Sequence, residues 1–377
     1  MIATHLSARA TDTPVRRLSV AAYTVPTDAP EADGTVTWTS TTLIVARVHA
    51  GGLIGTGWTY GAAACRSLIE DNLSPLVTGR DALDVPAAYD AMCRGARNIG
   101  RLGVAACAIS AVDMALWDLK ARLLDLRLAR LLGRVHDVVP IYGSGGFTSY
   151  DEDQLRRQFG HWVHEQRIPR VKMKIAESWG ERVDRDLARI ALARAVIGPD
   201  TELYVDANGG YTRKQAIRVA HEAADCDVRW LEEPVSSDDL AGLHEVRNNV
   251  APDVAAGEYG YDLPYFARMV RAGAVDCLQA DLSRCGGITE WQRVAAVAAA
   301  DNLQISGHCA PYLHLDAAAA TANLRHLEYF HDHVRIETLL FDGTVPPEPG
   351  GMLRPDPSRP GHGLAFRDDA ASSYRIG

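Results

Sequence analysis

The chain has 377 residues, of which 47% are hydrophobic and 23% are charged, so it can bury a large core and is not expected to be disordered. Its length predicts two domains. The net charge of −9 comes without a basic stripe and disfavours nucleic acid as a partner. Seven cysteines without CxxC spacing favour free thiols in a reducing cytoplasm, and neither an export signal nor a membrane span is predicted.

Residues 1–137 are predicted to form an α+β first domain. The predicted elements are strands at 18–23, 41–48 and 55–60 and an apolar helical span at 105–132. Residues 26–34 are predicted to form a polar, proline-bearing loop, within a mobile segment near 24–36. This loop is either solvated surface or a lid that closes over a pocket and excludes water.

Residues 138–340 repeat one pattern, in which a short apolar run ends in a charged or metal-binding side chain and a helical stretch follows. The first strand is predicted at 138–142, helices at 179–197, 213–224, 238–248 and 289–301, and the later runs end at Lys174, Asp206, Glu232, Glu258, Asp281, His308 and Glu328. Successive endings lie roughly 20 to 32 residues apart, the length of one βα unit. The pattern predicts an α/β fold with a TIM-type barrel, whose strand ends meet at one pocket. After Glu328 the chain is predicted to be turn-rich, with an irregular tail at 341–377.

Asp206, Glu232 and Glu258 end three consecutive predicted strands. Each of these acids alone would be read as ordinary strand-end charge. Together they supply hard carboxylate oxygens without a soft ligand nearby, a set that suits Mg²⁺, or Mn²⁺ in its place, better than zinc. The three acids therefore predict a metal site.

Two further groups at the strand ends point to acid-base chemistry. Lys174 shares the inward face of its strand with Lys172, since alternate residues lie on the same face. A lysine beside a divalent cation has its ammonium form disfavoured, which moves its pKa toward that of a usable base. Asp281 and His308 end adjacent strands, so the carboxylate can hold the imidazole tautomer and raise its basicity.

These residues carry a family resemblance over essentially the whole chain. The matching marks are Lys172-x-Lys174, Asp206-x-Asn208, Glu232-Glu233-Pro234, Gly257-Glu258, Asp281 ahead of Gly286-Gly287, His308 and Glu328. Together they resemble the mandelate racemase subgroup of the enolase superfamily. The segment 277–287 has no lysine, which separates the chain from the muconate lactonising branch and disfavours lactonising and acylamino-acid racemising chemistry.

The resemblance implies an α+β capping domain over a modified (β/α)7β barrel, with a tail that returns to the cap. It also implies a homo-oligomer built from dimers, of which an octamer is one form, and a Mg²⁺-dependent enzyme that removes the proton α to a carboxylate, as is established for this superfamily. Lys174 and His308 would face opposite sides of the α-carbon. Lys172 would add positive charge, and Glu328, if protonated, would donate a hydrogen bond.

Most acid-sugar members of the family are dehydratases, so the resemblance favours dehydration of an aldonate or aldarate to a 2-keto-3-deoxy acid. A racemase or epimerase of a 2-hydroxy acid is the alternative, and a non-catalytic sugar-acid-binding scaffold is the non-enzyme alternative. The intact Lys174 and Asp281/His308 argue against the scaffold, because binding alone requires no base. A zinc-dependent barrel hydrolase would have a His-x-His on the first strand, which is missing here.

Four residues are weaker candidates for substrate contacts: Asn208, Tyr142, Asp28 and His314. Asn208 is equally well explained by stabilising a turn, whereas Glu233 is expected to be structural. His314 or Arg325 is considered for the distal end of an extended substrate. His331 and His333 resemble a chelating pair, but the simpler interpretation is a polar loop after the last strand.

Overall fold

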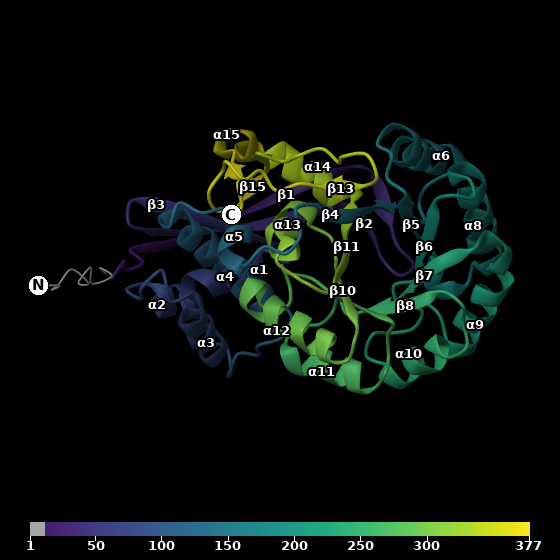
Figure 1. Cartoon of the computed structure of the whole chain (residues 1–377), viewed down its shortest axis with the longest axis horizontal. Helices are drawn as coiled ribbons and strands as arrows, with labels where there is room; N and C mark the ends of the chain where they lie inside the picture. Colours follow the sequence, from purple (N-terminus) through teal and green to yellow (C-terminus); the bar gives the residue numbers. More distant parts are fainter. Residues whose placement is uncertain (1–11) are drawn as a thin grey trace, which may run out of the picture.

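The computed structural model describes residues 12–377, which form an N-terminal unit packed against one side of a barrel (Figure 1). The last residues of the chain return to this N-terminal unit. No helix in the described residues is long and apolar enough to cross a membrane.

The N-terminal unit is an antiparallel sheet packed against helices. Its strands are β1 (Arg17–Ala32), β2 (Thr37–Ala50) and β3 (Leu53–Tyr60), and its helices are α1 (Ala64–Leu68), α2 (Ser74–Val77), α3 (Val85–Gly95), α4 (Val104–Leu123) and α5 (Leu128–Leu132), with a π-helical turn at Ile69–Leu73. The apolar helical span predicted at 105–132 is confirmed, but it divides near Asp125, which has a φ of +51°. Helix α4 lies close to the sheet, since a Cβ atom on Gly57 would be 2.3 Å from the carbonyl oxygen of Ala111.

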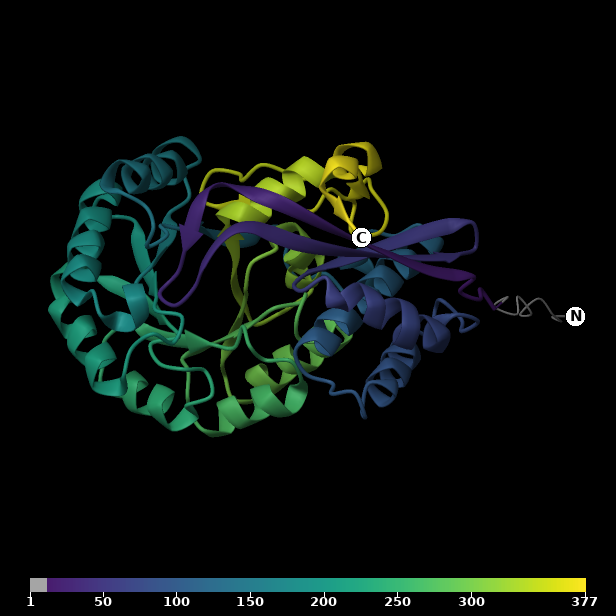
Figure 2. The ribbon, with the colours of Figure 1, turned by 180° about the vertical axis from the view of Figure 1, so that it is seen from behind.

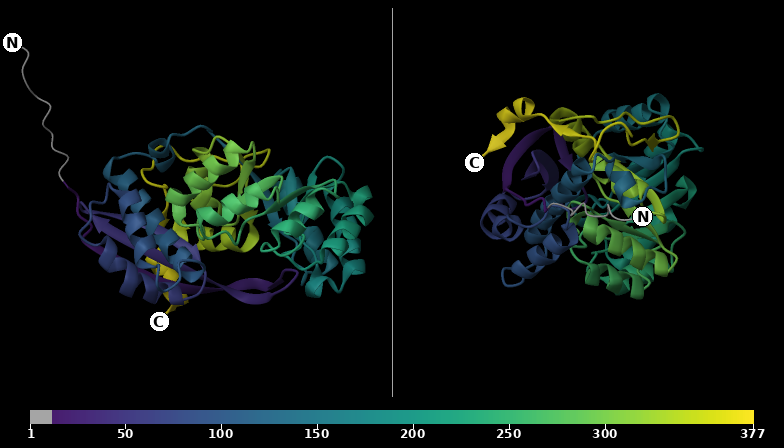
Figure 3. Two further views of the ribbon diagram at one scale, coloured as in Figure 1. Left: turned by 90° about the horizontal axis from the view of Figure 1, so that it is seen from below. Right: turned by 60° about the vertical axis from the view of Figure 1, so that its left-hand side comes forward.

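The hairpin of β1 and β2 extends from the cap across the mouth of the barrel (Figures 2 and 3). The prediction of a loop at 26–34 is wrong, because β1 continues to Ala32. Prolines are compatible with a strand here because, in the part of the chain that the structure describes, β15 pairs with Ala22 and Tyr23 and leaves the outer edge of residues 26–32 unpaired. A register shift between Pro26 and Glu31 marks an irregularity in the pairing.

The tip of this hairpin rests on loops of the barrel. The backbone N–H of Trp179 donates to the Gly34 carbonyl at 2.9 Å, and the Thr148 hydroxyl donates to the Asp33 carbonyl at 2.6 Å. A Cβ atom on Gly34 would lie 2.6 Å from the carbonyl oxygen of Ile175. Glycine is therefore needed at the tip for this close approach.

Within the described residues, eight parallel strands close into a barrel. They are β4 (Val139–Gly145), β5 (Arg170–Lys174), β6 (Glu202–Asp206), β7 (Val228–Glu232), β8 (Asp253–Ala256), β9 (Cys277–Ala280), β10 (Gln304–Gly307) and β11 (Leu324–Phe330). Neighbouring strands pair in chain order, and β11 pairs with β4 to close the ring. This arrangement confirms the TIM-type barrel with an antiparallel N-terminal capping sheet.

Helices surround the barrel (Figure 1). They are α6 (Glu152–Gly160), α7 (Glu177–Gly180), α8 (Val183–Ile197), α9 (Arg213–Glu222), α10 (Leu240–Arg247), α11 (Leu263–Arg271), α12 (Gly287–Ala300), α13 (Pro311–Ala319) and α14 (His331–Leu340), with short π- and 3₁₀-helical turns at His161–Glu165 and Ala224–Cys226. The helix predicted at 179–197 begins later, at Val183, because Ser178 and Trp179 have positive φ angles.

The prediction of a turn-rich chain directly after Glu328 is wrong, since α14 occupies residues 331–340. Its buried residues include Ile336 and Leu340, and the first proline of the following segment is Pro346. The tail contains β12 (Phe341–Asp342), β13 (Met352–Leu353), β14 (Ala365–Phe366), α15 (Asp368–Ala371), a 3₁₀ turn (Ser372–Tyr374) and β15 (Arg375–Ile376). Strand β15 pairs with β1, which ties the tail to the capping sheet.

Helix α4 of the cap meets the barrel at the loop between β9 and α12. The Ser110 hydroxyl accepts a hydrogen bond from Gly286 N–H at 2.8 Å, and Asp113 accepts two from Thr289. A Cβ atom on Gly287 would lie 2.5 Å from Asp113 Oδ2. The Gly-Gly pair therefore permits close contact with the cap and holds the loop that follows Asp281.

Candidate active site

A cavity of about 510 Å³ lies between the barrel mouth and the capping unit. Lys174, Asn208, Glu258 and His308 line it from the ends of β5, β6, β8 and β10. The carboxyl ends of parallel strands thus bring side chains from distant parts of the sequence to one place. Three of these four residues were predicted from the sequence as catalytic or metal-binding groups.

Asp206, Glu232 and Glu258 form a compact carboxylate cluster. One oxygen of each lies within 4.8 Å of the others, and all three side chains are buried. Glu258 Oε2 accepts no hydrogen bond within the described residues, although His308 Nε2 lies 3.2 Å from it. Three buried carboxylates without a soft ligand, one of them incompletely satisfied, fit a hard divalent cation such as Mg²⁺.

Lys172 is buried among the carboxylates. Its Nζ contacts Glu232 directly, Glu328 at 2.8 Å and Asp206 at 3.6 Å. Burial alone would lower the pKa of this lysine, but the surrounding carboxylates outweigh burial and raise it. Lys172 is therefore an ammonium that offsets the negative charge of the cluster.

Lys174 lies 2.5 Å from Asp206 Oδ2 and reaches the cavity. Burial is the largest single influence and lowers its pKa, but the charges of Asp206, Glu328 and Glu258 together outweigh burial, so the pKa is raised. The same contact, together with Lys172, outweighs burial at Asp206 and lowers the pKa of that carboxyl. In this contact Lys174 is therefore an ammonium that pairs with Asp206.

Asp281 and His308 form the expected pair. His308 Nδ1 lies 2.8 Å from Asp281 Oδ2, and His308 Nε2 lies 3.2 Å from Glu258 Oε2. Burial alone would raise the pKa of Asp281, but its hydrogen bond with His308 and the charges of His308 and Arg284 together outweigh burial and lower it. Asp281 is therefore an ionised acceptor that favours a proton on Nδ1 and directs Nε2 toward the cavity.

Residues with positive φ follow several of these strand ends. Asn208 has a φ of +45°, Glu233 of +39° and Cys309 of +52°. Backbone strain of this kind often occurs where a chain must aim functional side chains. Here Asn208 lies two residues after Asp206, and the other two residues directly follow Glu232 and His308.

Glu328 is held as an acceptor. It accepts hydrogen bonds from the Ser144 hydroxyl at 2.6 Å and from Cys309 N–H at 2.9 Å, beside the ammonium of Lys172. Burial raises the pKa of Glu328, but Lys172, His308 and Lys174 together outweigh burial, and the net pKa falls well below its ordinary range. The protonated form considered from the sequence is therefore disfavoured in this arrangement.

Tyr142 lies beneath the carboxylate cluster and does not line the cavity. Its ring packs with Tyr204 and with His326, and Lys172 Nζ lies 5.3 Å from the ring centroid. Tyr142 therefore belongs to an aromatic floor that supports the charged side chains from below.

Asp28 and His314 are also placed away from the cavity. Asp28 lies on β1 and is 3.0 Å from His331 Nε2, so it connects the hairpin to α14. His314 is fully buried and both ring nitrogens are used, one facing Leu282 N–H at 2.9 Å and the other the Ala310 carbonyl at 2.9 Å. Neither residue lines the cavity as a substrate contact would.

The remaining candidates are Arg325, His331 and His333, and they differ in whether they reach the cavity. Arg325 pairs with Asp253 at the start of β8, which is the opposite end of the barrel from the cavity, so it cannot reach a substrate there. His331 and His333 are not in a loop, because both lie in the first turn of α14. His333 lines the cavity, but its ring stacks on Tyr60 with centroids 3.5 Å apart.

Arg284 is a functional candidate that sequence reasoning missed. It lines the cavity, and its guanidinium lies 3.4 Å from both Glu258 Oε1 and Asp281 Oδ2. It therefore connects the carboxylate cluster to the Asp281/His308 pair. Its position three residues after Asp281 was the available signal, since a short loop brings such residues together.

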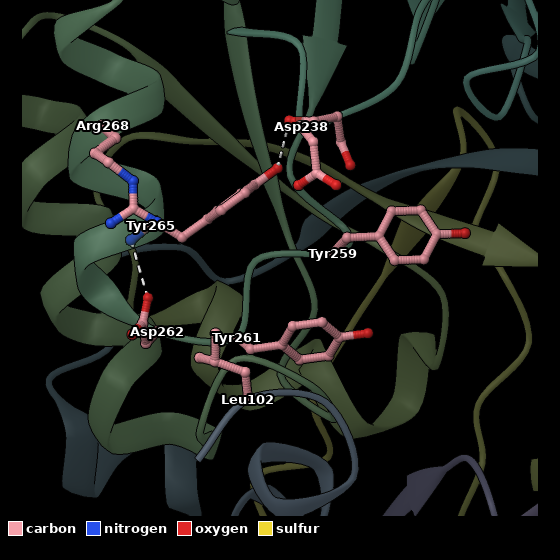
Figure 4. Close-up of a pocket in the computed structure, with 8 residues that line it drawn as sticks. Leu102, Asp238, Tyr259, Tyr261, Asp262, Tyr265 and Arg268 are labelled. Atoms are coloured by element: carbon pink, nitrogen blue, oxygen red, sulfur yellow. Dashed lines mark hydrogen bonds between the residues drawn. The ribbon is translucent and has the colours of Figure 1, made fainter. Parts of the chain in front are cut away.

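A second cavity of about 510 Å³ lies beside the first and shares Tyr259 with it (Figure 4). Its labelled residues include Tyr261, Tyr265 and Arg268. None of the catalytic or metal-binding residues predicted from the sequence lines it. The acid-base and carboxylate groups thus select the first cavity as the active site.

Two family models match the chain. The model described as mandelate racemase / muconate lactonizing enzyme, N-terminal domain, matches residues 16–133, and the one described as enolase C-terminal domain-like matches residues 154–370. A curated relative, 3,6-anhydro-alpha-L-galactonate cycloisomerase of Streptomyces coelicolor, is 30% identical over 344 residues, which cover 89% of this chain and 92% of the relative.

Solved structures show the same similarity. A mandelate racemase/muconate lactonizing enzyme-like protein from Rubrobacter xylanophilus has a TM-score of 0.93 and 50% identity, covering 96% of this chain and 100% of that chain. L-talarate/galactarate dehydratase from Salmonella typhimurium, liganded with Mg and L-lyxarohydroxamate, has a TM-score of 0.88 and 25% identity, covering 100% of this chain and 96% of that chain.

Proposed function

Because the chain belongs to the mandelate racemase and muconate lactonizing enzyme family of the enolase superfamily, we propose that it removes the proton α to the carboxylate of an acid sugar and eliminates water. The product is a 2-keto-3-deoxy acid. One observation carries the proposal: Lys174 and His308, two groups able to transfer protons, line one cavity together with Glu258 of the carboxylate cluster.

Asp206, Glu232 and Glu258 would hold Mg²⁺, or Mn²⁺ in its place. When bound, the ion would stabilise the negative charge that develops on the substrate carboxylate as the α-proton leaves. Lys172 contributes a second positive charge from below, since its ammonium is fixed among Glu232, Glu328 and Asp206.

Proton transfer is assigned to Lys174 and His308. In the favoured reaction one of them takes the α-proton, which breaks the C2–H bond, and the electron pair forms a C2–C3 double bond as the C3–O bond breaks. An acid protonates the departing hydroxyl, so water leaves, and the resulting enol tautomerises to the 2-keto acid. His308 Nε2 suits the acid role because Asp281 stabilises the doubly protonated imidazolium.

Release of Lys174 from Asp206 is a requirement of this scheme when Lys174 acts as the base. Its Nζ lies 2.5 Å from Asp206 Oδ2, a contact that keeps the amine protonated. A neutral amine is needed to accept the α-proton. The hairpin of β1 and β2 would serve as the lid that excludes water from this transfer.

Epimerisation of a 2-hydroxy acid is the second candidate. If Lys174 and His308 face opposite sides of the α-carbon, one can remove the proton and the other return it without loss of water. The presence of two proton-transferring groups in one cavity favours this reaction over simple binding, because a sugar-acid-binding scaffold needs neither. We also propose that the protein forms a homo-oligomer built from dimers.

The test is a screen of aldonic and aldaric acids with Mg²⁺ and a colorimetric assay for 2-keto acids. The similar proteins include a 3,6-anhydro-alpha-L-galactonate cycloisomerase and an L-talarate/galactarate dehydratase, so acids with one and with two carboxylates belong in the screen. Dehydration predicts a keto acid from at least one member. Epimerisation predicts a new diastereomer by NMR without a keto acid, and no reaction with any member would favour the binding scaffold.

A further inference from the structure

We infer that the substrate is an aldonate, with a single carboxylate, because the described residues of the capping unit that line the cavity offer hydroxyls and a carboxylate but no cation. The inference rests on the proposed function and specifies its substrate class. An aldarate carries a second carboxylate at the far end of its carbon chain, whereas an aldonate ends in a hydroxyl. At the end of the cavity remote from the carboxylate cluster, an aldarate therefore requires a cation or hydrogen-bond donors. An aldonate requires groups that can exchange hydrogen bonds with a hydroxyl, including acceptors.

The capping wall consists of the hairpin turn, β2 and the end of β3. Its polar residues are Asp33, Ser40, Thr41, Thr42 and Tyr60. Among the described residues that line this wall, there is no lysine, arginine or histidine. A second carboxylate bound here would lack a charged partner and would face the negative charge of Asp33, so it would be selected against.

Behind this wall lie further acids. Thr41 donates its hydroxyl hydrogen to Asp332, which is fully buried in α14, and Trp38 donates its indole N–H to Glu31 at 2.8 Å. The guanidinium of Arg335 is within 2.6 Å of Asp332, but it does not line the cavity. The side chains that lie directly behind the capping wall, among the described residues, thus include carboxyl groups but no unpaired cation.

The cationic side chains on the barrel side of the cavity already form ion pairs with carboxylates. Lys174 contacts Asp206, and Arg284 lies between Glu258 and Asp281 at 3.4 Å from each. Burial lowers the pKa of His333 to about 3, so its imidazole is neutral near pH 7. Within residues 12–377, neither side of the cavity therefore supplies a positive charge that is free to pair with a second carboxylate.

The same wall suits a hydroxylated chain. Asp33 Oδ1 accepts from the backbone N–H groups of Thr35 and Val36, which leaves Oδ2 without a hydrogen bond in the described chain. The Ser40 hydroxyl likewise makes none within the residues that the structure describes. A polyol hydroxyl can donate to Asp33 and exchange hydrogen bonds with Ser40, whereas a carboxylate can only accept.

The first experiment compares matched acids on the full-length protein with Mg²⁺: gluconate with glucarate, galactonate with galactarate, and arabinonate with arabinarate. The inference predicts that kcat/KM for the best aldonate exceeds that of its matched aldarate by roughly 10²-fold or more, as for a site that leaves a charge unpaired. Equal or higher values for the aldarate would overturn the inference while leaving the proposed function intact. The absence of any turnover would contradict the proposed function instead.

Binding measurements test the preference for aldonates independently of the proposed reaction. Calorimetry on a Mg²⁺-loaded His308→Asn variant, which cannot complete turnover by the proposed scheme, measures affinity without chemistry. Aldonates should bind more tightly than their matched aldarates, and tighter binding of aldarates would overturn the inference even if no substrate is turned over.

A positive charge introduced at Ser40 tests whether the charge of the capping wall causes the preference for aldonates. Ser40 is exposed on β2 and lines the cavity, so a longer side chain can be accommodated there. Ser40→Lys should raise the ratio of aldarate to aldonate kcat/KM by about tenfold, whereas the neutral control Ser40→Gln should not, since a rim charge acts through electrostatic complementarity. The same ratio in both variants would show that charge on this wall does not select the substrate.

Discussion

His308 Nδ1 lies 2.8 Å from Asp281 Oδ2, and this contact joins the ends of two adjacent barrel strands into one acid-base unit. Asp281 also accepts a hydrogen bond from Ser283 N–H at 2.7 Å, which fixes its carboxylate. The imidazole therefore has a set orientation, with Nε2 toward the cavity and Glu258.

Asp281→Asn should lower turnover by roughly 10²-fold or more, because an amide replaces the negative charge that stabilises the imidazolium of His308. The carbonyl oxygen of the asparagine can still accept from Ser283, so folding should be preserved. Steady-state kinetics give the loss, and an unchanged melting temperature serves as the control. Wild-type turnover in this variant would show that the pair is not catalytic.

Lys174→Ala and His308→Ala should each reduce turnover by roughly 10² to 10⁴-fold, the scale of a lost general base or acid. Matched controls are Lys214→Ala and His221→Ala on the exposed surface of α9, which should leave kcat unchanged. Full activity in either catalytic-site variant would remove that residue from the mechanism.

Mg²⁺ should raise the melting temperature of the wild-type protein and Glu258→Gln should weaken this effect. A ligand that binds only the folded state at 100 times its Kd adds about 2.7 kcal/mol of stability. Differential scanning calorimetry with and without EDTA measures the shift, and Glu222→Gln on the surface of α9 is the control. An equal response in Glu258→Gln and wild type would contradict the assignment of this carboxylate.

Asp113 should make stability depend on pH. Burial raises the pKa of Asp113 to about 7, so the folded protein keeps a proton that the unfolded chain has lost between about pH 4 and pH 7. Stability therefore falls as pH rises through this window, by roughly 4 kcal/mol at most, and then levels off.

Asp113→Asn removes this titration but retains an acceptor for Thr289. Between pH 5 and pH 8 the melting temperature of wild type should consequently decline more than that of the variant. Other buried acids, including Glu31 and Glu337, titrate in both proteins, so the difference isolates Asp113. Parallel melting curves across this range would show that Asp113 is not protonated in the folded state.

Gly34→Ala should reduce kcat/KM by about 10²-fold, the cost of misplacing a substrate-contacting element by roughly 1 Å. The added Cβ would lie 2.6 Å from the Ile175 carbonyl, so the hairpin tip must move away from the barrel. Gly160→Ala is the control because a Cβ there meets nothing closer than 3.9 Å. Equal kinetics for both variants would show that the position of the tip does not matter.

The barrel and the grouping of its charged strand ends could be predicted because both follow from local patterns. The apolar runs before Asp206 and Glu232 recur at the spacing of βα units, and parallel strands place their ends together. The same reasoning placed Asp281 beside His308. Such predictions need only strand direction and order, which the repeat itself supplies.

The errors arose where packing overrides local signals. Pro26 and Pro30 suggested a loop, but the outer edge of β1 tolerates residues that donate no hydrogen bond. Arg325 was considered for the substrate although it is the second residue of β11 and so lies at the far end of the barrel. Arg284 was missed because its ion pairs depend on a loop conformation that the cap holds in place.

The most direct test of the account uses the best acid-sugar substrate labelled with deuterium at C2, incubated with the wild-type protein and Mg²⁺. Deuterium NMR of the solvent should show one C2 deuteron released for each keto acid formed, and Lys174→Ala or His308→Ala should slow this release by roughly 10²-fold or more. Wild-type rates of keto acid formation and deuteron release in both variants would contradict abstraction of the α-proton by these two groups, which is the central claim.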